Sequence, residues 1–237
     1  MVGEPKARIA CSQRLRQRLI GQIFCSEEGQ YPEGEIELRY QELEANDTVY
    51  QNLCQEEKKR EKELVGAVEE LEIYRELFKP IEGCGPMIAA RIIAAIGDIR
   101  LFASNAKLKA ACGVHVLPDG RFPRHRSGEQ ANWNGLARQA LYLLGEQFNR
   151  RPDSVWGQKL REYKKKFREK HPVVEVVNGK KRYTNGHIHN MAIWRTLTKF
   201  VERLWKDWWK IEKARQTKAL NKERPVTAAP TEQRAAL

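Results

Sequence analysis

The chain has 237 residues, of which 41% are hydrophobic and 31% charged, and its formal net charge is +12. This length and apolar content are sufficient for one or two domains with a hydrophobic core, so the chain need not be disordered. No stretch approaches the roughly 18 apolar residues of a membrane span, and the N-terminus lacks the apolar core of a signal peptide, so we expect a cytoplasmic protein with no membrane partner.

The charges are unevenly distributed along the chain. Residues 27–78 contain 16 Asp and Glu against 6 Lys and Arg, whereas residues 119–216 contain 10 against 23. The C-terminal half is therefore the candidate region for binding a polyanion.

The cysteines predict neither a disulfide framework nor a metal site. There are five of them, widely scattered, with no Cys-x-x-Cys pair. Cys84 and Cys112 stand among small apolar residues, so we interpret them as small buried hydrophobic side chains.

The N-terminal third is predicted to be helical. Residues 1–34 contain a short helix and a polar loop, and could be the remnant of a lost domain. In residues 35–79, apolar side chains recur three or four positions apart, which predicts a long helix or helical pair with coiled-coil character. Two interpretations remain open: the seam pairs with a second copy in a homo-oligomer, or it packs within one chain. The apolar positions are Tyr50, Leu53, Leu64, Ala67, Leu71, Tyr74 and Phe78.

A tight turn between two helices is predicted around Gly83 and Gly85. These glycines flank one residue just before Pro86, which suits the first position of the small-residue helix that follows. Such a turn can direct unpaired backbone amides outward at the positive end of a helix dipole, and this arrangement binds phosphate without a side chain. The alternative is an ordinary turn between two packed helices.

Beyond the turn, the sequence predicts a short helix at 105–113, an exposed basic loop at 114–132 and another helix at 134–149. The loop contains two prolines, two glycines and three arginines. The helix after it is predicted to bury Leu136, Ala140, Leu143, Leu144 and Phe148.

The C-terminal half continues with a basic helix at 150–170, whose apolar seam is Trp156, Leu160, Tyr163 and Phe167. An Asn-Gly pair within 173–184 predicts a small β-hairpin. Residues 187–214 form the clearest helix, and residues 215–237 are predicted to be a disordered tail. On that helix we define a cationic rail within a sector of about 80°, opposite an apolar face. The rail comprises Arg195, Lys199, Arg203, Lys206, Lys210 and Lys213; the apolar face comprises Leu197, Val201, Leu204, Trp208 and Ile211.

The order of these segments resembles the C-terminal half of the insertion-sequence one-ten family of transposases. The matching segments are the coiled-coil-like helix, PIEGCGPMIAAR from Pro80, IGDIRLF from Ile96 and KLKAACGV from Lys107. They continue with a basic loop ending in Ser127-Gly128, then NGLARQALY from Asn134 and GHIHNMAIWR from Gly186. The glycine turn is similar to a helix-hairpin-helix, a motif that grips the nucleic-acid backbone irrespective of sequence.

The resemblance implies a mainly α fold, with a transposase-type nucleic-acid-binding domain at 80–214. It implies DNA as a partner, and a structured guide RNA as a second one. Family members add a four-carboxylate (DEDD), RuvC-like domain that binds magnesium, and we expect this chain to lack that domain. We therefore expect no cofactor in this chain, with magnesium entering only if such a domain is supplied. A non-catalytic nucleic-acid-binding module derived from a transposase is the alternative, so the sequence leaves enzymatic activity open.

Two groups of candidate site residues follow. Ser127 occupies the position that matches the family's nucleophilic serine, with arginines beside it to stabilise the attacked phosphate. The candidate nucleic-acid-binding residues are Gly83, Gly85, Arg121, Arg124, Arg126, Arg138, Arg195, Lys199 and Arg203.

Overall fold

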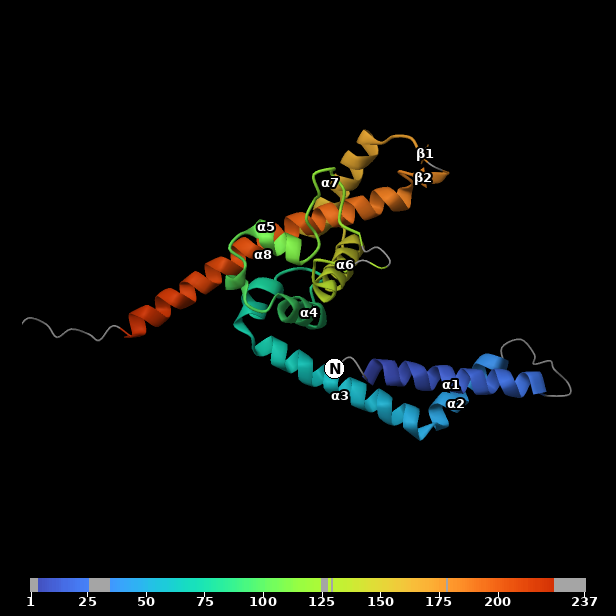
Figure 1. Cartoon of the computed structure of the whole chain (residues 1–237). Coiled ribbons are helices and arrows are strands. Elements are labelled where there is room, and N and C mark those ends of the chain that lie inside the picture. The colour runs from blue at the N-terminus through green and yellow to red at the C-terminus, as the bar shows by residue number, and fades with distance from the viewer. Residues whose placement is uncertain (1–3, 26–34, 125–127, 129, 178, 224–237) are drawn as a thin grey trace, which may run out of the picture. The chain divides into compact units, whose positions relative to one another are not determined.

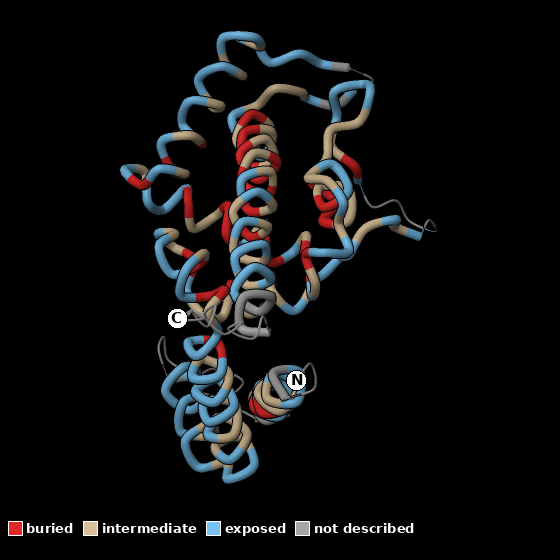
Figure 2. Tube along the Cα trace, turned by 90° about the vertical axis from the view of Figure 1, so that its left-hand side faces the viewer, coloured by how far each residue is buried: buried red, intermediate tan, exposed pale blue. Residues whose placement is uncertain are grey.

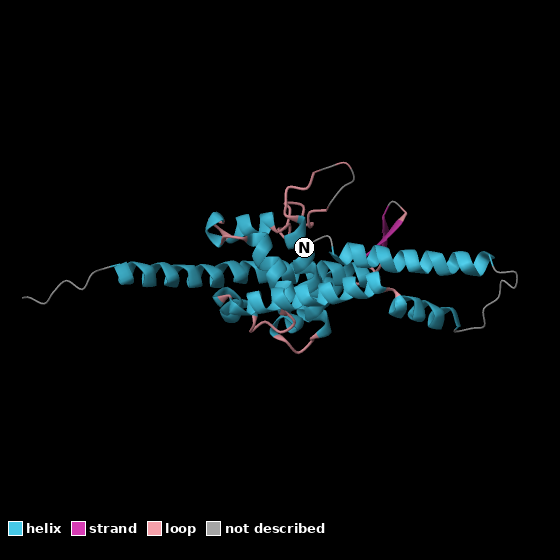
Figure 3. Ribbon diagram, turned by 90° about the horizontal axis from the view of Figure 1, so that it is seen from below, coloured by secondary structure: helices cyan, strands magenta, loops and turns pink. Residues whose placement is uncertain are grey.

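The computed structural model describes residues 4–25, 35–124, 128, 130–177 and 179–223 (Figure 1). The fold is mainly α, as predicted, and among the described residues the only strands form one small hairpin (Figure 3). The chain divides into two compact units, Met1–Ala67 and Val68–Leu237. Each unit is described by itself.

The N-terminal unit is built from α1 (Glu4–Cys25), α2 (Glu35–Asn46) and most of α3 (Thr48–Glu70). Helix α1 packs against α2. The Ser12 and Tyr40 hydroxyl groups lie 2.6 Å apart, and the Tyr40 hydroxyl donates to Glu44 over 2.5 Å. Among its described residues only Leu15 and Leu19 are buried, so polar contacts carry much of the packing here.

The predicted helical region 35–79 is divided twice. Asp47 separates α2 from α3, and its carboxylate accepts a 2.7 Å hydrogen bond from the Tyr50 amide, as an N-cap does. At Leu71 the α-helical pattern stops, and a π-helical turn, η1 (Tyr74–Phe78), follows. The prediction of one continuous apolar seam is therefore wrong at Leu71, which is 41% exposed. Tyr74 and Phe78, the two other members of the predicted seam in this segment, lie within the π turn and are buried.

The C-terminal unit contains η1, a 3-10 turn named η2 (Ile99–Leu101), and seven other helices and strands. They are α4 (Pro86–Ile96), α5 (Asn105–Ala111), α6 (Gly135–Arg150), α7 (Val155–Lys170), β1 (Glu175–Val177), β2 (Lys180–Arg182) and α8 (Asn185–Glu223). The strands pair antiparallel with Glu175 opposite Arg182, which confirms the predicted hairpin. The helices predicted at 105–113, 134–149, 150–170 and 187–214 are also confirmed.

Helix α8 is central to this unit, because α5, α6 and α7 all pack on it, while α4 packs on α6. Figure 2 shows that buried residues are concentrated in this unit. Four of the five residues predicted for the apolar face of α8 are buried; they are Leu197, Val201, Leu204 and Trp208. The rings of Phe148, Trp156 and Phe200 pack together, with centroids 5.2–5.9 Å apart, and join α6 and α7 to α8.

The buried face of α6 differs from the prediction. Leu136 is 67% exposed and Leu143 is 36% exposed, whereas Ala137 and Leu141 are buried. Helix α6 is covered by α4 and α8 together, and close approach selects small side chains. A Cβ on Gly145 would lie 2.9 Å from Ile193 Cγ2, which is closer than side chains pack.

Helix α8 extends past the predicted end at residue 214. It continues through residues 215–223, where the sequence predicted disorder, and residues 224–237 lie outside the described part of the chain. Arg215 pairs with Glu72 and Glu212 at 2.8 and 2.9 Å, which ties this turn of α8 to the start of the C-terminal unit.

The predicted burial of Cys84 and Cys112 is confirmed. Cys84 and Cys112 are buried free thiols, and burial raises the pKa of each to about 12.

Candidate nucleic-acid interface

The glycine turn has the predicted local geometry at only one of its glycines. Gly83 adopts a φ of +89°, whereas Gly85 is extended, with φ −66° and ψ 167°, and forms the N-cap of α4. Gly85 therefore has a backbone conformation that other residues also adopt, and only Gly83 uses the positive φ that favours glycine. Pro86 is the first residue of α4, as predicted, and the Cys84 amide closes the turn by donating to the Ile81 carbonyl at 2.9 Å.

The surroundings of the turn bear on the helix-hairpin-helix resemblance. The element before it is the π turn η1 rather than a regular α-helix. A hollow of about 540 Å³ borders the turn, and its charged side chains are Lys79, Arg151 and the carboxylate of Glu82. In the first turn of α4, Pro86 has no amide hydrogen, and the Ile88 and Ala89 amides both donate to the Gly85 carbonyl, at 3.1 and 3.0 Å. This leaves the Met87 amide as the one in this turn without a backbone acceptor among the described residues. The turn thus combines two cations with a helix N-terminus, while Gly83 packs closely against α6.

Arg138 occupies a half-buried position between two tryptophans. Its guanidinium carbon lies 5.1 Å from the Trp133 ring centroid and 4.3 Å from that of Trp194. The guanidinium donates hydrogen bonds to the carbonyl of Gly113 and, at 2.7 Å, to that of Pro123. Burial lowers the pKa of this group. Arg138 therefore ties both ends of segment 113–123 to α6 and α8.

The basic loop is irregular and exposed where the structure describes it. Arg121 is exposed and lies 3.7 Å from the Asp119 carboxylate, and Arg124 is exposed as well. Ser127, the candidate nucleophile, and Arg126 lie outside the described residues.

Sequence reasoning missed a stack of three rings that lies near Arg124. The rings of His171, Tyr183 and His187 are nearly parallel, with successive centroids 3.7 and 5.4 Å apart. The Tyr183 amide donates to His187 Nδ1 at 3.0 Å, although Tyr183 has a left-handed φ of +57°. The pKa of His187 is lowered, first by burial and then by the positive charges of Arg124 and Arg182 and by His171.

The cationic rail of α8 is less uniform than the sequence predicted. Two carboxylates stand among its cations: Glu202 accepts from Lys199 at 3.0 Å, and Asp207 accepts from Arg203 at 2.5 Å. Lys206 and Lys210 lie within 3.8 and 3.4 Å of these same carboxylates. The positive charge of the rail is therefore partly neutralised by carboxylates on either side of it, because residues three or four positions apart on a helix meet and pair. Arg195 and Lys213 differ from these four, since neither makes an ion pair with any residue that the structure describes.

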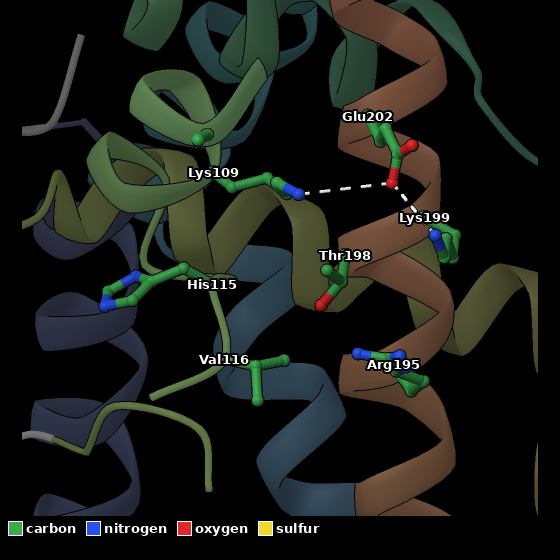
Figure 4. A pocket seen from close by; sticks show the side chains of 8 residues that line it. Lys109, His115, Val116, Arg195, Thr198, Lys199 and Glu202 are labelled. Carbon is green, nitrogen blue, oxygen red and sulfur yellow. Dashed lines mark hydrogen bonds and ion pairs between the residues drawn. The ribbon is translucent and has the colours of Figure 1, made fainter. Parts of the chain in front are cut away.

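Arg195 and Lys199 form one side of a pocket of about 360 Å³ between α5, residues 115–116 and α8 (Figure 4). Lys109 of α5 forms the opposite side, and its ammonium lies 4.0 Å from Glu202. The lining residues are Ala106, Lys109, His115, Val116, Arg195, Thr198, Lys199 and Glu202. Lys109 and Glu202 were not predicted as site residues, although the spacing of Lys199 and Glu202 on one helix is a visible signal of pairing.

The described residues contain neither a group of three or more potential metal-ligating side chains nor a helix long and apolar enough to cross a bilayer. What the C-terminal unit offers is basic side chains around a pocket, a glycine turn and a basic loop. This combination defines a helical unit with a surface suited to polyanions.

Residues 75–146 match the model of the transposase IS116/IS110/IS902 family. This part of the chain, from η1 to α6, is therefore similar to a region of the proteins of that family, and the match covers less than half of the chain. No curated protein and no solved structure matches the chain.

Proposed function

We propose that this chain is the nucleic-acid-binding part of a DNA transposase, in which the C-terminal unit contacts the phosphate backbone. The observation that carries the proposal is the convergence of Lys109, Arg195 and Lys199, from α5 and α8, in the unit that contains the transposase-family region. The family region ends within α6, so the proposal extends the role of that region to α8.

Binding of this kind is electrostatic and largely independent of sequence. Lys and Arg side chains neutralise phosphates and release condensed counterions, while amides at helix N-termini add neutral phosphate contacts. Both DNA and a structured guide RNA present such a backbone. We therefore propose that both bind through the α5–α8 surface and the turn before α4, and that Ser127 acts as nucleophile once a magnesium-binding four-carboxylate domain is supplied.

Salt-dependent binding of duplex DNA tests the proposal. We expect the logarithm of affinity to fall linearly with the logarithm of salt concentration, by about 0.9 for each phosphate contact. Replacing Arg195, Lys199 and Arg203 together by Gln should weaken binding and flatten this slope. The matched control replaces Lys58, Lys59 and Lys62 by Gln, which removes the same charge from exposed positions of α3. Binding that responds equally to both triple variants would contradict a specific role for α8.

A further inference from the structure

We infer that the pocket between α5 and α8 is a binding site for a phosphate group, with Arg195 as its principal ligand and Glu202 as a competing carboxylate within the protein. That the phosphate belongs to a nucleic-acid backbone rests on the proposed function. The existence of the anion site does not.

Arg195 is placed to bind rather than to stabilise the fold. Figure 4 shows its guanidinium directed into the pocket, towards Val116. It has no side-chain hydrogen bond or ion pair within the described chain, whereas Arg203, two turns further along α8, pairs with Asp207. A guanidinium presents a planar fork of donors that matches two oxygens of one phosphate.

The rest of the pocket is fixed before any ligand enters. The Thr198 hydroxyl donates to the Val114 carbonyl at 2.6 Å, which holds the 114–116 segment against α8. Thr198 lines the pocket, but its hydroxyl hydrogen is already donated to a backbone carbonyl and is therefore not available to a ligand. The volume of about 360 Å³ lies near the lower end of the range for small-ligand sites, so a phosphate with its attached sugar is of suitable size.

The charge of the pocket favours an anion, although one carboxylate lies within it. Three cationic side chains, Lys109, Arg195 and Lys199, line the pocket beside the single carboxylate of Glu202. Lys199 keeps the pKa of Glu202 low through its hydrogen bond, so the carboxylate stays ionised. Glu202 thereby holds the lysine ammonium groups at the pocket in the absence of a ligand. The same negative charge opposes an incoming phosphate.

This arrangement predicts opposite effects for two neighbouring substitutions. Arg195→Gln should lower affinity for duplex DNA about tenfold or more, since a charge-assisted contact is lost. Lys210→Gln removes the same charge from an exposed position outside the pocket and should lower affinity less than about threefold. Glu202→Gln should raise affinity several-fold, whereas Asp207→Asn, the same change outside the pocket, should raise it less.

The experiment measures fluorescence anisotropy of a labelled 20-base-pair duplex with the full chain and these four variants, and uses inorganic pyrophosphate as competitor. We expect pyrophosphate to displace the duplex from the wild type and to be markedly weaker against Arg195→Gln. Thermal denaturation shows whether Glu202→Gln is folded, and a gain in affinity with a folded Glu202→Gln variant supports the site even if Arg195→Gln is unstable.

Three results would contradict the pocket, the proposed function or the assignment of the ligand as phosphate. Equal losses with Arg195→Gln and Lys210→Gln would overturn the pocket while leaving DNA binding in place. Direct binding of pyrophosphate that depends on Arg195, without any duplex binding, would support the pocket and overturn the proposed function. Displacement by a glutamate-rich peptide of equal charge, as effective as pyrophosphate, would overturn the assignment to phosphate.

Discussion

The Arg138 guanidinium carbon lies 4.3 Å from the centroid of the Trp194 ring, so that a charged residue of α6 packs on the face of an aromatic residue of α8. The same guanidinium donates to the backbone carbonyls of Gly113 and Pro123. A side chain that sequence reasoning assigned to nucleic-acid binding thus also holds together the segment between α5 and the basic loop.

We therefore expect Arg138→Gln to lower the free energy of unfolding by about 2–3 kcal/mol, since charge-assisted hydrogen bonds and cation–π contacts are both lost. Arg138→Lys should recover part of the loss, because an ammonium keeps the charge but not the planar fork. Urea denaturation measures both. Arg203→Gln, at an exposed ion pair, is the control and should change stability little. An equal effect of the two Gln variants would show that Arg138 is not needed for stability.

The two glycines of the turn should respond differently to an added methyl group. Gly83→Ala should destabilise the protein by roughly 1–2 kcal/mol, because it combines a positive φ with a Cβ placed 2.9 Å from Gln147 Cβ. Gly85→Ala should be nearly neutral, since its φ is ordinary and no atom outside its chain neighbours lies within 4 Å of the added Cβ. Thermal denaturation compares the pair. Similar melting temperatures for both variants would contradict the assigned backbone geometry.

His187 should make stability depend on pH below neutrality. Its folded-state pKa lies below the unfolded value of about 6.5, so the unfolded chain binds a proton first as pH falls. The stabilisation is complete above the unfolded pKa and is lost as pH falls through the folded pKa. The Tyr183 amide donates a hydrogen bond to His187 Nδ1 at 3.0 Å. Protonation of Nδ1 would break this hydrogen bond, because both nitrogens would then be donors.

The measurement is the free energy of unfolding between pH 7.5 and 5, compared with that of His187→Gln. We expect the wild type to lose more stability over this interval than the variant, which has no ring to protonate. A slope unaffected by the substitution would assign the pH dependence to other groups.

The last prediction concerns Ser127 as a nucleophile. A serine hydroxyl is a weak nucleophile until a base or a metal activates it, and the attacked phosphate needs its charge neutralised. We expect the 237-residue chain, tested alone on a nicked suicide DNA substrate with guide RNA, to form no adduct that survives denaturation. Adding a four-carboxylate domain with magnesium should produce one, and Ser127→Ala should abolish it. An adduct formed by the chain alone and lost in Ser127→Ala would refute the dependence on that domain, and no adduct under any condition would favour a non-catalytic binding module.

Local patterns in the sequence were sufficient to predict most individual elements. Alternation around an Asn-Gly pair predicted the hairpin, Pro86 marked the start of α4, and the apolar spacing of α8 identified Leu197, Val201, Leu204 and Trp208 as buried. These features depend on backbone sterics and helical periodicity, which act over a few residues.

Only the tertiary structure decided which of the candidate side chains are available to a ligand. The ion pair of Arg203 with Asp207 could be predicted from their spacing of four residues on one helix. The ion pair of Lys109 with Glu202 could not, because these residues are far apart in the chain. The buried side of α6 likewise depends on the packing of both α4 and α8 against it. The spacing of apolar residues along a helix identifies one buried face more clearly than two. Charge and periodicity therefore specified a basic helical protein. Packing between distant segments placed the Arg138 guanidinium between two tryptophans, and placed Arg195 in a pocket where it has no ion pair with a described residue, because long-range contacts leave no local periodic signal.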